Sequence, residues 1–300
     1  MGMRLAKQAR LSLKGQWKGA VLAQWMVLAA GLFLLLLEVA ALRLTGLGME
    51  KVIHIDEIDG DPGLLLHAAV IVGIVALDLL LTSPLRLGQA AYYYRVTDSR
   101  RQKPVPSACL RRYYRWNRYG VAVRWRLSLW IFRVLWGVAC FLPAALILGF
   151  AQLLRERGDG GPLNAVTVLF SQAFGLFALL AGFMALQLIM LRYMPAQYFL
   201  QEGKSVSAAF KKSRRLMRGR TGEAAWMMAG FSGWLLACLL VLPYLYVSPL
   251  YLTSRALWVR RKEEERVEQE RREWAQTRRL DPLPRAVKSG NGTTFKRWLW

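Results

Sequence analysis

The sequence predicts an all-α, polytopic transmembrane helical bundle, and two features of the chain support this prediction. Apolar residues are gathered in long stretches with at most one charge each, and basic residues are gathered in the segments between them. A helix needs about 20 predominantly apolar residues to cross the hydrocarbon core of a bilayer. Five stretches reach that length: 19–42, 63–85, 127–150, 165–191 and 224–254.

The distribution of Lys and Arg predicts the orientation of these spans. Segments 1–18, 92–126 and 192–223 carry five, ten and eight basic residues, whereas 43–62 and 151–164 carry two each. Short loops rich in Lys and Arg stay in the cytoplasm. The loops are therefore expected to alternate between inside and outside, starting from a cytoplasmic N-terminus.

The last apolar stretch, 224–254, determines the number of spans. Thirteen basic residues follow from position 255 onward, and a single span would place them outside. Pro243 and Pro249 supply a turn. We therefore expect two short spans, 224–242 and 244–258, which gives six spans with both termini cytoplasmic. The alternative is a single kinked fifth span.

The end of the chain differs in composition from the rest. We expect residues 1–259 to form the transmembrane domain, 260–280 a charged cytoplasmic helix and 281–300 a mobile basic tail. Residues of opposite charge are spaced four apart in the helix, which stabilises it: Arg261–Glu265, Arg266–Glu270 and Glu268–Arg272. This helix is the predicted surface for a protein partner or for self-association.

Two basic cytoplasmic segments are predicted to lie on the membrane surface. In 110–126 basic and aromatic residues alternate, which favours an interfacial helix over a solvated loop. In 205–220 Ser205 is placed to cap a helix and Gly219 to end it. The residues expected to contact anionic lipid headgroups are Arg111, Arg112, Arg115, Arg118, Lys211, Lys212, Arg214 and Arg215.

Charged residues inside the spans suggest two further pairs. At about 1.5 Å per residue, Asp78 and Arg133 fall at the same depth of the second and third spans, so we expect them to face each other. Glu38 and His67 meet in depth near the outer border. The first pair forms an ion or proton path, or fixes the register of the helices. For Glu38, snorkelling to the outer surface is the alternative.

Small residues predict where helices pack closely, and aromatic residues predict which segments lie at the membrane surface. The glycines Gly137, Gly175, Gly182 and Gly233 are expected to permit close approach of helices. The ring cluster 92–94 is expected at the level of the headgroups, and packing within the protein is the alternative. Segment 83–95 (SPLRLGQAAYYYR) agrees with segment 248–260 (SPLYLTSRALWVR) at six of thirteen positions. This similarity indicates either an internal repeat or shared needs at a helix–membrane border.

Composition excludes several kinds of site. The net charge of +23 would suit nucleic acid, but the basic residues lie beside apolar spans and no nucleic-acid motif accompanies them, so anionic lipid is the expected partner. Three scattered cysteines and two histidines predict neither a metal site nor a disulfide framework. No cofactor or catalytic motif is present. These absences favour a non-enzymatic protein but leave enzyme activity open.

Several segments together resemble the domain-of-unknown-function 975 family of bacterial integral membrane proteins. They are 11–22 (LSLKGQWKGAVL), 83–96 (SPLRLGQAAYYYRV), the region of Pro143, 205–226 (SVSAAFKKSRRLMRGRTGEAAW), and the FSGWLL and PYLYVSPLYL stretches that follow. The resemblance covers roughly residues 8–260. It implies a six-span membrane protein and transfers no catalytic residues.

Two functions agree with these observations. The first is a membrane scaffold or accessory subunit that binds anionic lipid and a partner protein. The alternative is a transporter or channel for a small solute or ion that uses the charges within the spans. In either case the expected location is the bacterial plasma membrane, with several passes.

Overall fold

The computed structural model describes residues 2–44, 62–98, 104–157, 161–231, 233 and 241–280, and all regular structure within these ranges is helical. The chain divides into two units, Met1–Val259 and Arg260–Trp300. The long helices are α2 (Trp17–Leu44), α4 (Pro62–Val96), α6 (Trp116–Arg157), α7 (Pro162–Leu191) and α12 (Val241–Leu280). Shorter helices precede or connect them: α1 (Gly2–Ser12), α5 (Pro106–Arg111), η2 (Arg112–Tyr114), α8 (Ala196–Phe199), η3 (Leu200–Glu202), α9 (Val206–Met217) and α10 (Thr221–Ala229).

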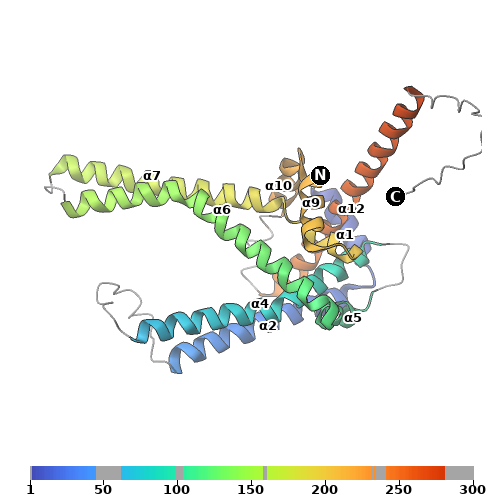
Figure 1. Cartoon of the computed structure of the whole chain (residues 1–300), viewed down its shortest axis with the longest axis horizontal. Helices are drawn as coiled ribbons and strands as arrows, with labels where there is room; N and C mark the ends of the chain where they lie inside the picture. The colour runs from blue at the N-terminus through green and yellow to red at the C-terminus, as the bar shows by residue number, and fades with distance from the viewer. Residues whose placement is uncertain are drawn as a thin grey trace, which may run out of the picture. The chain divides into compact units, whose positions relative to one another are not determined.

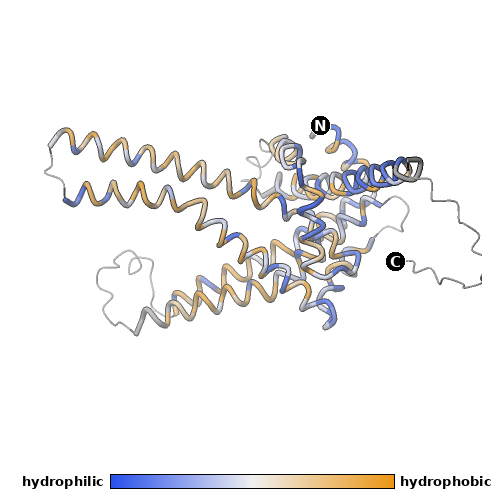
Figure 2. The backbone as a smooth tube through the Cα atoms, turned by 45° about the horizontal axis from the view of Figure 1, so that its top comes forward, coloured by the Kyte–Doolittle hydropathy of each residue, from blue (hydrophilic) through white to orange (hydrophobic). Residues whose placement is uncertain are grey.

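Four of the helical segments are long and apolar enough to cross a membrane, and they coincide with the first four predicted spans: Trp17–Leu44, Ala68–Val96, Trp116–Arg157 and Leu163–Glu202. Only 11 to 22% of the residues in their apolar windows are buried. Figure 2 shows these apolar helices in orange. Helices that expose this much apolar surface need an apolar solvent around them, and the acyl chains of a bilayer provide one.

The spans are arranged as two hairpins, in which α2 lies beside α4 and α6 beside α7 (Figure 1). Gly182 and Gly175 lie where α7 meets α6, as expected. A Cβ atom at Gly182 would come within 2.5 Å of the Cys140 carbonyl oxygen. The same expectation is wrong for Gly137, since a Cβ there would meet no described atom within 4 Å. For Gly233 it stays a prediction, because position 232 and segment 234–240 lie outside the described residues.

The buried core of the first unit gathers at the ends of the spans where the basic loops lie. It includes Tyr92 and Tyr93, whose side chains are 0 and 1% exposed. Their hydroxyls donate to backbone carbonyl oxygens, Tyr93 to Ala20 of α2 at 3.0 Å and Tyr92 to Gln16, just before α2, at 3.3 Å. Tyr92 and Tyr93 are therefore packing residues whose hydroxyls find partners within the protein, whereas the depth of these rings in a membrane stays a prediction.

Of the two segments predicted to form helices on the membrane surface, one forms the expected helix and the other does not, while their contact with the membrane stays a prediction. In α9 the Ser205 hydroxyl accepts from the Ala208 amide, and Gly219 has a φ of 73° just beyond the helix. Segment 110–126 is not one helix. Its backbone turns to extended at Arg115, and α6 begins at Trp116 and runs on into the span. No proline follows Trp116 until Pro143, so helical hydrogen bonding propagates from the basic segment into the apolar one.

The same local arrangement, a helix, a glycine of positive φ and a second helix, occurs at the start of the chain and again in its last third. Helices α1 and α9 each precede a glycine of positive φ, Gly15 at 77° and Gly219 at 73°, and a further helix follows each glycine. Buried residues lie at matching distances before and after these glycines: Leu5, Ala9, Leu13, Ala20 and Ala23 around Gly15, and Ala209, Ser213, Met217, Ala224 and Met227 around Gly219. The two segments therefore share a turn and a pattern of burial.

The second unit continues α12 as a polar helix. Arg266 pairs with Glu270 at 3.5 Å and Arg272 with Glu268 at 3.9 Å, as predicted. The predicted Arg261–Glu265 pair is not formed, because Glu265 binds Lys262 three residues before it at 2.9 Å. The predicted tail 281–300 lies outside the described residues, and so do position 232 and segment 234–240 of the predicted fifth span.

Candidate functional site

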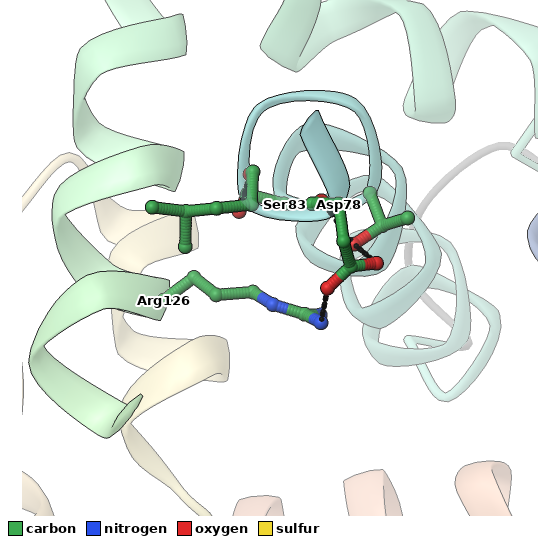
Figure 3. A network of polar contacts seen from close by, with 5 residues as sticks. Asp78, Ser83 and Arg126 are labelled. Atoms are coloured by element: carbon green, nitrogen blue, oxygen red, sulfur yellow. Dashed lines mark hydrogen bonds and ion pairs between the residues drawn. The ribbon is translucent and has the colours of Figure 1, made fainter. Parts of the chain in front are cut away.

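An ion pair links the two hairpins at Asp78 of α4. Its Oδ2 accepts from Arg126 Nη2 of α6 at 2.8 Å, and the Thr82 hydroxyl donates to its Oδ1 at 3.0 Å. Figure 3 shows the Arg126 side chain reaching across from α6 to this carboxylate. Beside it the Ser83 hydroxyl donates to the Leu79 carbonyl oxygen. Both carboxylate oxygens are thus satisfied, so the pair is suited to holding α4 and α6 in register.

The predicted partner of Asp78, Arg133, is replaced by Arg126. Arg133 lies seven residues further along α6, which is about 10 Å along the helix axis and nearly the same face. Its side chain is exposed. The prediction chose the correct helix face but the wrong turn, because it began the third span at residue 127 whereas α6 begins at Trp116.

The other predicted pair is only partly described. Glu38 lies in α2 and is half-buried. The side chain of His67 falls outside the described residues, although its backbone belongs to α4. The Glu38–His67 pair therefore stays a prediction.

A basic surface covers the outer face of α9. The opposite face of the helix packs into the core through Ala209, Phe210, Ser213, Leu216 and Met217. The outward face carries a shallow depression of about 440 Å³ lined by Lys211, Arg214, Arg215 and Arg218. We call these four residues the α9 basic surface. Three of them were predicted from the sequence, whereas Arg218 was left out of the predicted contacts.

Lys212 does not belong to the α9 basic surface. Its Nζ binds the Glu202 carboxylate at 3.0 Å and lies 4.1 Å from the centroid of the Phe199 ring. The predicted contact residues between positions 111 and 118 also differ in exposure. Arg111 and Arg115 are exposed, whereas Arg112 and Arg118 are half-buried. Desolvation lowers the pKa of the Arg112 guanidinium, and the charge of Arg118 adds to this effect.

A polar cavity of about 370 Å³ lies between α2, α4, α8 and α12. In it Gln89 Nε2 donates to Gln24 Oε1 at 2.7 Å, and Gln24 Nε2 donates to the Tyr244 hydroxyl. Two arginines also line it, Arg86 and Arg255. Both segments of the repeated SPL motif contribute to this lining, Arg86 and Gln89 from the first and Ser248 and Arg255 from the second.

Only a partial signal for this cavity is present in the sequence. Gln24 is a polar residue within an apolar span, and the two SPL segments are similar in sequence. Neither observation identifies Tyr244 or Arg255 as neighbours of Gln24, since these residues are more than two hundred positions away from it in the chain. Among the described residues, no group of three or more His, Cys, Asp or Glu side chains is placed to hold a metal ion.

Comparison with known proteins identifies no similar protein. No protein family, curated protein or solved structure matches the chain. The resemblance to the domain-of-unknown-function 975 family therefore stays an expectation from the sequence motifs.

Proposed function

We propose that the protein is a six-span membrane scaffold of the bacterial plasma membrane, which binds anionic lipid headgroups and a partner protein on its cytoplasmic side. The observation that carries the proposal is the α9 basic surface. Its four cationic side chains share one depression, and the apolar face of the same helix is anchored in the core. Cations fixed at the end of apolar spans attract anionic headgroups.

The repeated local arrangement supports six spans rather than five. In the first copy, α1, Gly15 and α2 are followed by the return helix α4, which carries the first SPL segment. In the second copy, α9, Gly219 and α10 are followed by α12, which carries the second SPL segment. If the second copy also crosses the bilayer twice, the basic segment after residue 254 returns to the cytoplasm, as the positive-inside rule requires.

Lipid association tests the headgroup proposal directly. Protein in bilayers of phosphatidylcholine with a minor fraction of phosphatidylglycerol is compared with its K211Q/R214Q/R218Q variant, and lipid selectivity is measured with spin-labelled lipids. The variant should lose most of the preference for phosphatidylglycerol, and salt should weaken the preference of the wild type. R261Q/R271Q/R272Q is the matched control, because it removes three exposed arginines from the second unit. Equal selectivity in all three proteins would refute the proposal.

Partner binding is assigned to the charged part of α12. Val267 and Trp274 lie seven residues apart on nearly the same face, and both are exposed, at 37 and 59%. Large apolar residues exposed on an otherwise polar helix are a typical contact for another helix. Trp274→Ala should therefore lower the oligomeric mass or remove the protein that co-purifies from membranes, as measured by light scattering and mass spectrometry. The exposed Gln276→Ala substitution should change neither.

A transporter is the second candidate function, and the Asp78–Arg126 pair is the observation that favours it. The Asp78 side chain is 39% exposed, so an ion or proton could reach it. If the pair carries transport, D78N should abolish a proton-coupled flux in proteoliposomes while the protein stays folded. If the pair only fixes register, D78N should change the stability of the protein and no flux should be found in the wild type.

A further inference from the structure

We propose that the polar cavity between α2, α4, α8 and α12 binds a phosphate group. This site is distinct from the α9 basic surface, since no residue lines both. The proposal rests on three properties of the cavity: its charge, its hydrogen-bond donors and its size.

The cavity carries positive charge without a compensating acid. Arg86 and Arg255 line it, and none of its described lining residues is acidic. The Arg255 Nε atom is buried without a hydrogen-bond partner among the described residues, and its guanidinium lies 5.4 Å from the centre of the Tyr251 ring. A buried donor of a charged group without an acceptor is unfavourable, and an anion in the cavity would supply the acceptor.

Neutral donors complete the site. The Tyr244 hydroxyl accepts a hydrogen bond from Gln24, which in turn accepts from Gln89. Because the hydroxyl is already an acceptor in this chain, its own proton is left to donate. Gln197 also lines the cavity and offers a further amide. Arginine forks together with hydroxyl and amide donors form the usual coordination of a phosphate, whose oxygens are all acceptors.

The charge of the cavity suits a phosphate, and its size admits one. A volume of about 370 Å³ is at the small end of ligand pockets, which span roughly 300–1,000 Å³. Inorganic phosphate or the phosphate monoester of a lipid headgroup fits that space. A phosphate monoester carries nearly two negative charges at neutral pH, which balances two guanidinium groups.

A thiol probe at Ser248 tests the proposal in the full chain. Ser248 lines the cavity, and S248C is made in a C140S/C238S background, which leaves the buried Cys109. An anionic methanethiosulfonate should modify S248C at least tenfold faster than a cationic one. Q276C, at an exposed position of the second unit, should show no such preference. Equal rates at S248C would overturn the proposal.

Two phosphate probes then distinguish the source of the ligand. If inorganic phosphate slows the modification of S248C, the site takes a soluble phosphate. If dihexanoyl phosphatidic acid slows it and inorganic phosphate does not, the site takes a lipid headgroup. If neither probe slows it, the proposal is wrong. K211Q/R214Q/R218Q should keep the protection, so failure of the proposed surface function would be seen separately.

Arg255 is the residue whose loss should matter most. R255Q in the S248C background should abolish the preference for the anionic reagent and reduce the affinity for the phosphate probe at least tenfold, whereas R255K should keep the preference. If R255Q does not yield monodisperse protein, R86Q tests the same charge. Unchanged protection in a folded R255Q or R86Q protein would overturn the proposal.

Discussion

Asp78 of α4 and Arg126 of α6 form an ion pair of 2.8 Å that joins the two hairpins of the first unit. The Arg126 side chain is 18% exposed and that of Asp78 39%, so the pair is partly removed from water. Removing one partner of such a pair leaves the other charge poorly solvated.

Neutralising Arg126 should therefore destabilise the protein, whereas neutralising Arg133 should not. We expect R126Q to lower the free energy of unfolding by about 1–2 kcal/mol, a figure between those for exposed and buried pairs. R133Q is the matched control, because Arg133 is exposed and lies two turns further along α6. Unfolding in mixed detergent measures both. The exchange variant D78R/R126D should recover part of the loss, and equal effects of R126Q and R133Q would contradict the ion pair.

The contact of α6 with α7 should depend on Gly182. A Cβ atom there would come within 2.5 Å of the Cys140 carbonyl oxygen, which belongs to the backbone and cannot move aside. G182A should cost about 1–3 kcal/mol of stability, the usual penalty for overpacking. G137A in the same hairpin is the control, since no described atom lies within 4 Å of its Cβ. Thermal unfolding measures the stability of both variants. An unchanged stability of G182A would refute the close approach of α6 and α7.

Tyr113 should stabilise the packing of η2 through its hydroxyl. The side chain is 1% exposed and its hydroxyl donates to Gln201 Oε1 at 2.7 Å. Y113F leaves that amide oxygen without its donor, and we expect a loss of about 1 kcal/mol. Y246F is a suitable comparison, because Tyr246 is 42% exposed and its ring stacks on Trp17 at 4.9 Å, a contact that phenylalanine keeps. Similar melting temperatures for Y113F and wild type would speak against the bond.

Cys109 should react slowly with thiol reagents at neutral pH. Burial raises the pKa of its thiol, and the nearby Arg95 guanidinium only partly opposes this effect. The thiolate is the reactive form, so at a given pH less of Cys109 is reactive than of a free cysteine, and the rate should rise as the pH is raised. In a C140S/C238S background, maleimide labelling at pH 7 should be much slower at Cys109 than at S207C, an exposed position. Equal rates would show that α5 does not bury this thiol.

Local features of the chain were predictable where the signal lies within one segment. The four apolar helices follow from uninterrupted apolar stretches, and α9 follows from a capping serine, an apolar stripe and a closing glycine. Two of the failures, segment 110–126 and the partner of Asp78, share a cause. Segment 110–126 has no strong local signal for where its helix begins. Because α6 begins at Trp116, the partner of Asp78 is Arg126, two turns before the expected Arg133.

The sequence by itself determined that the described chain is helical and that four of its helices carry apolar surface over their length, because hydrophobicity and helix signals are properties of neighbouring residues. Only the tertiary structure decided that Arg126 binds Asp78, that Gly182 rather than Gly137 lies at a helix contact, and that Gln24, Arg86 and Arg255 share a cavity. These relations depend on how far each helix is rotated and shifted against its neighbours, and side chains distant in the sequence set those offsets jointly.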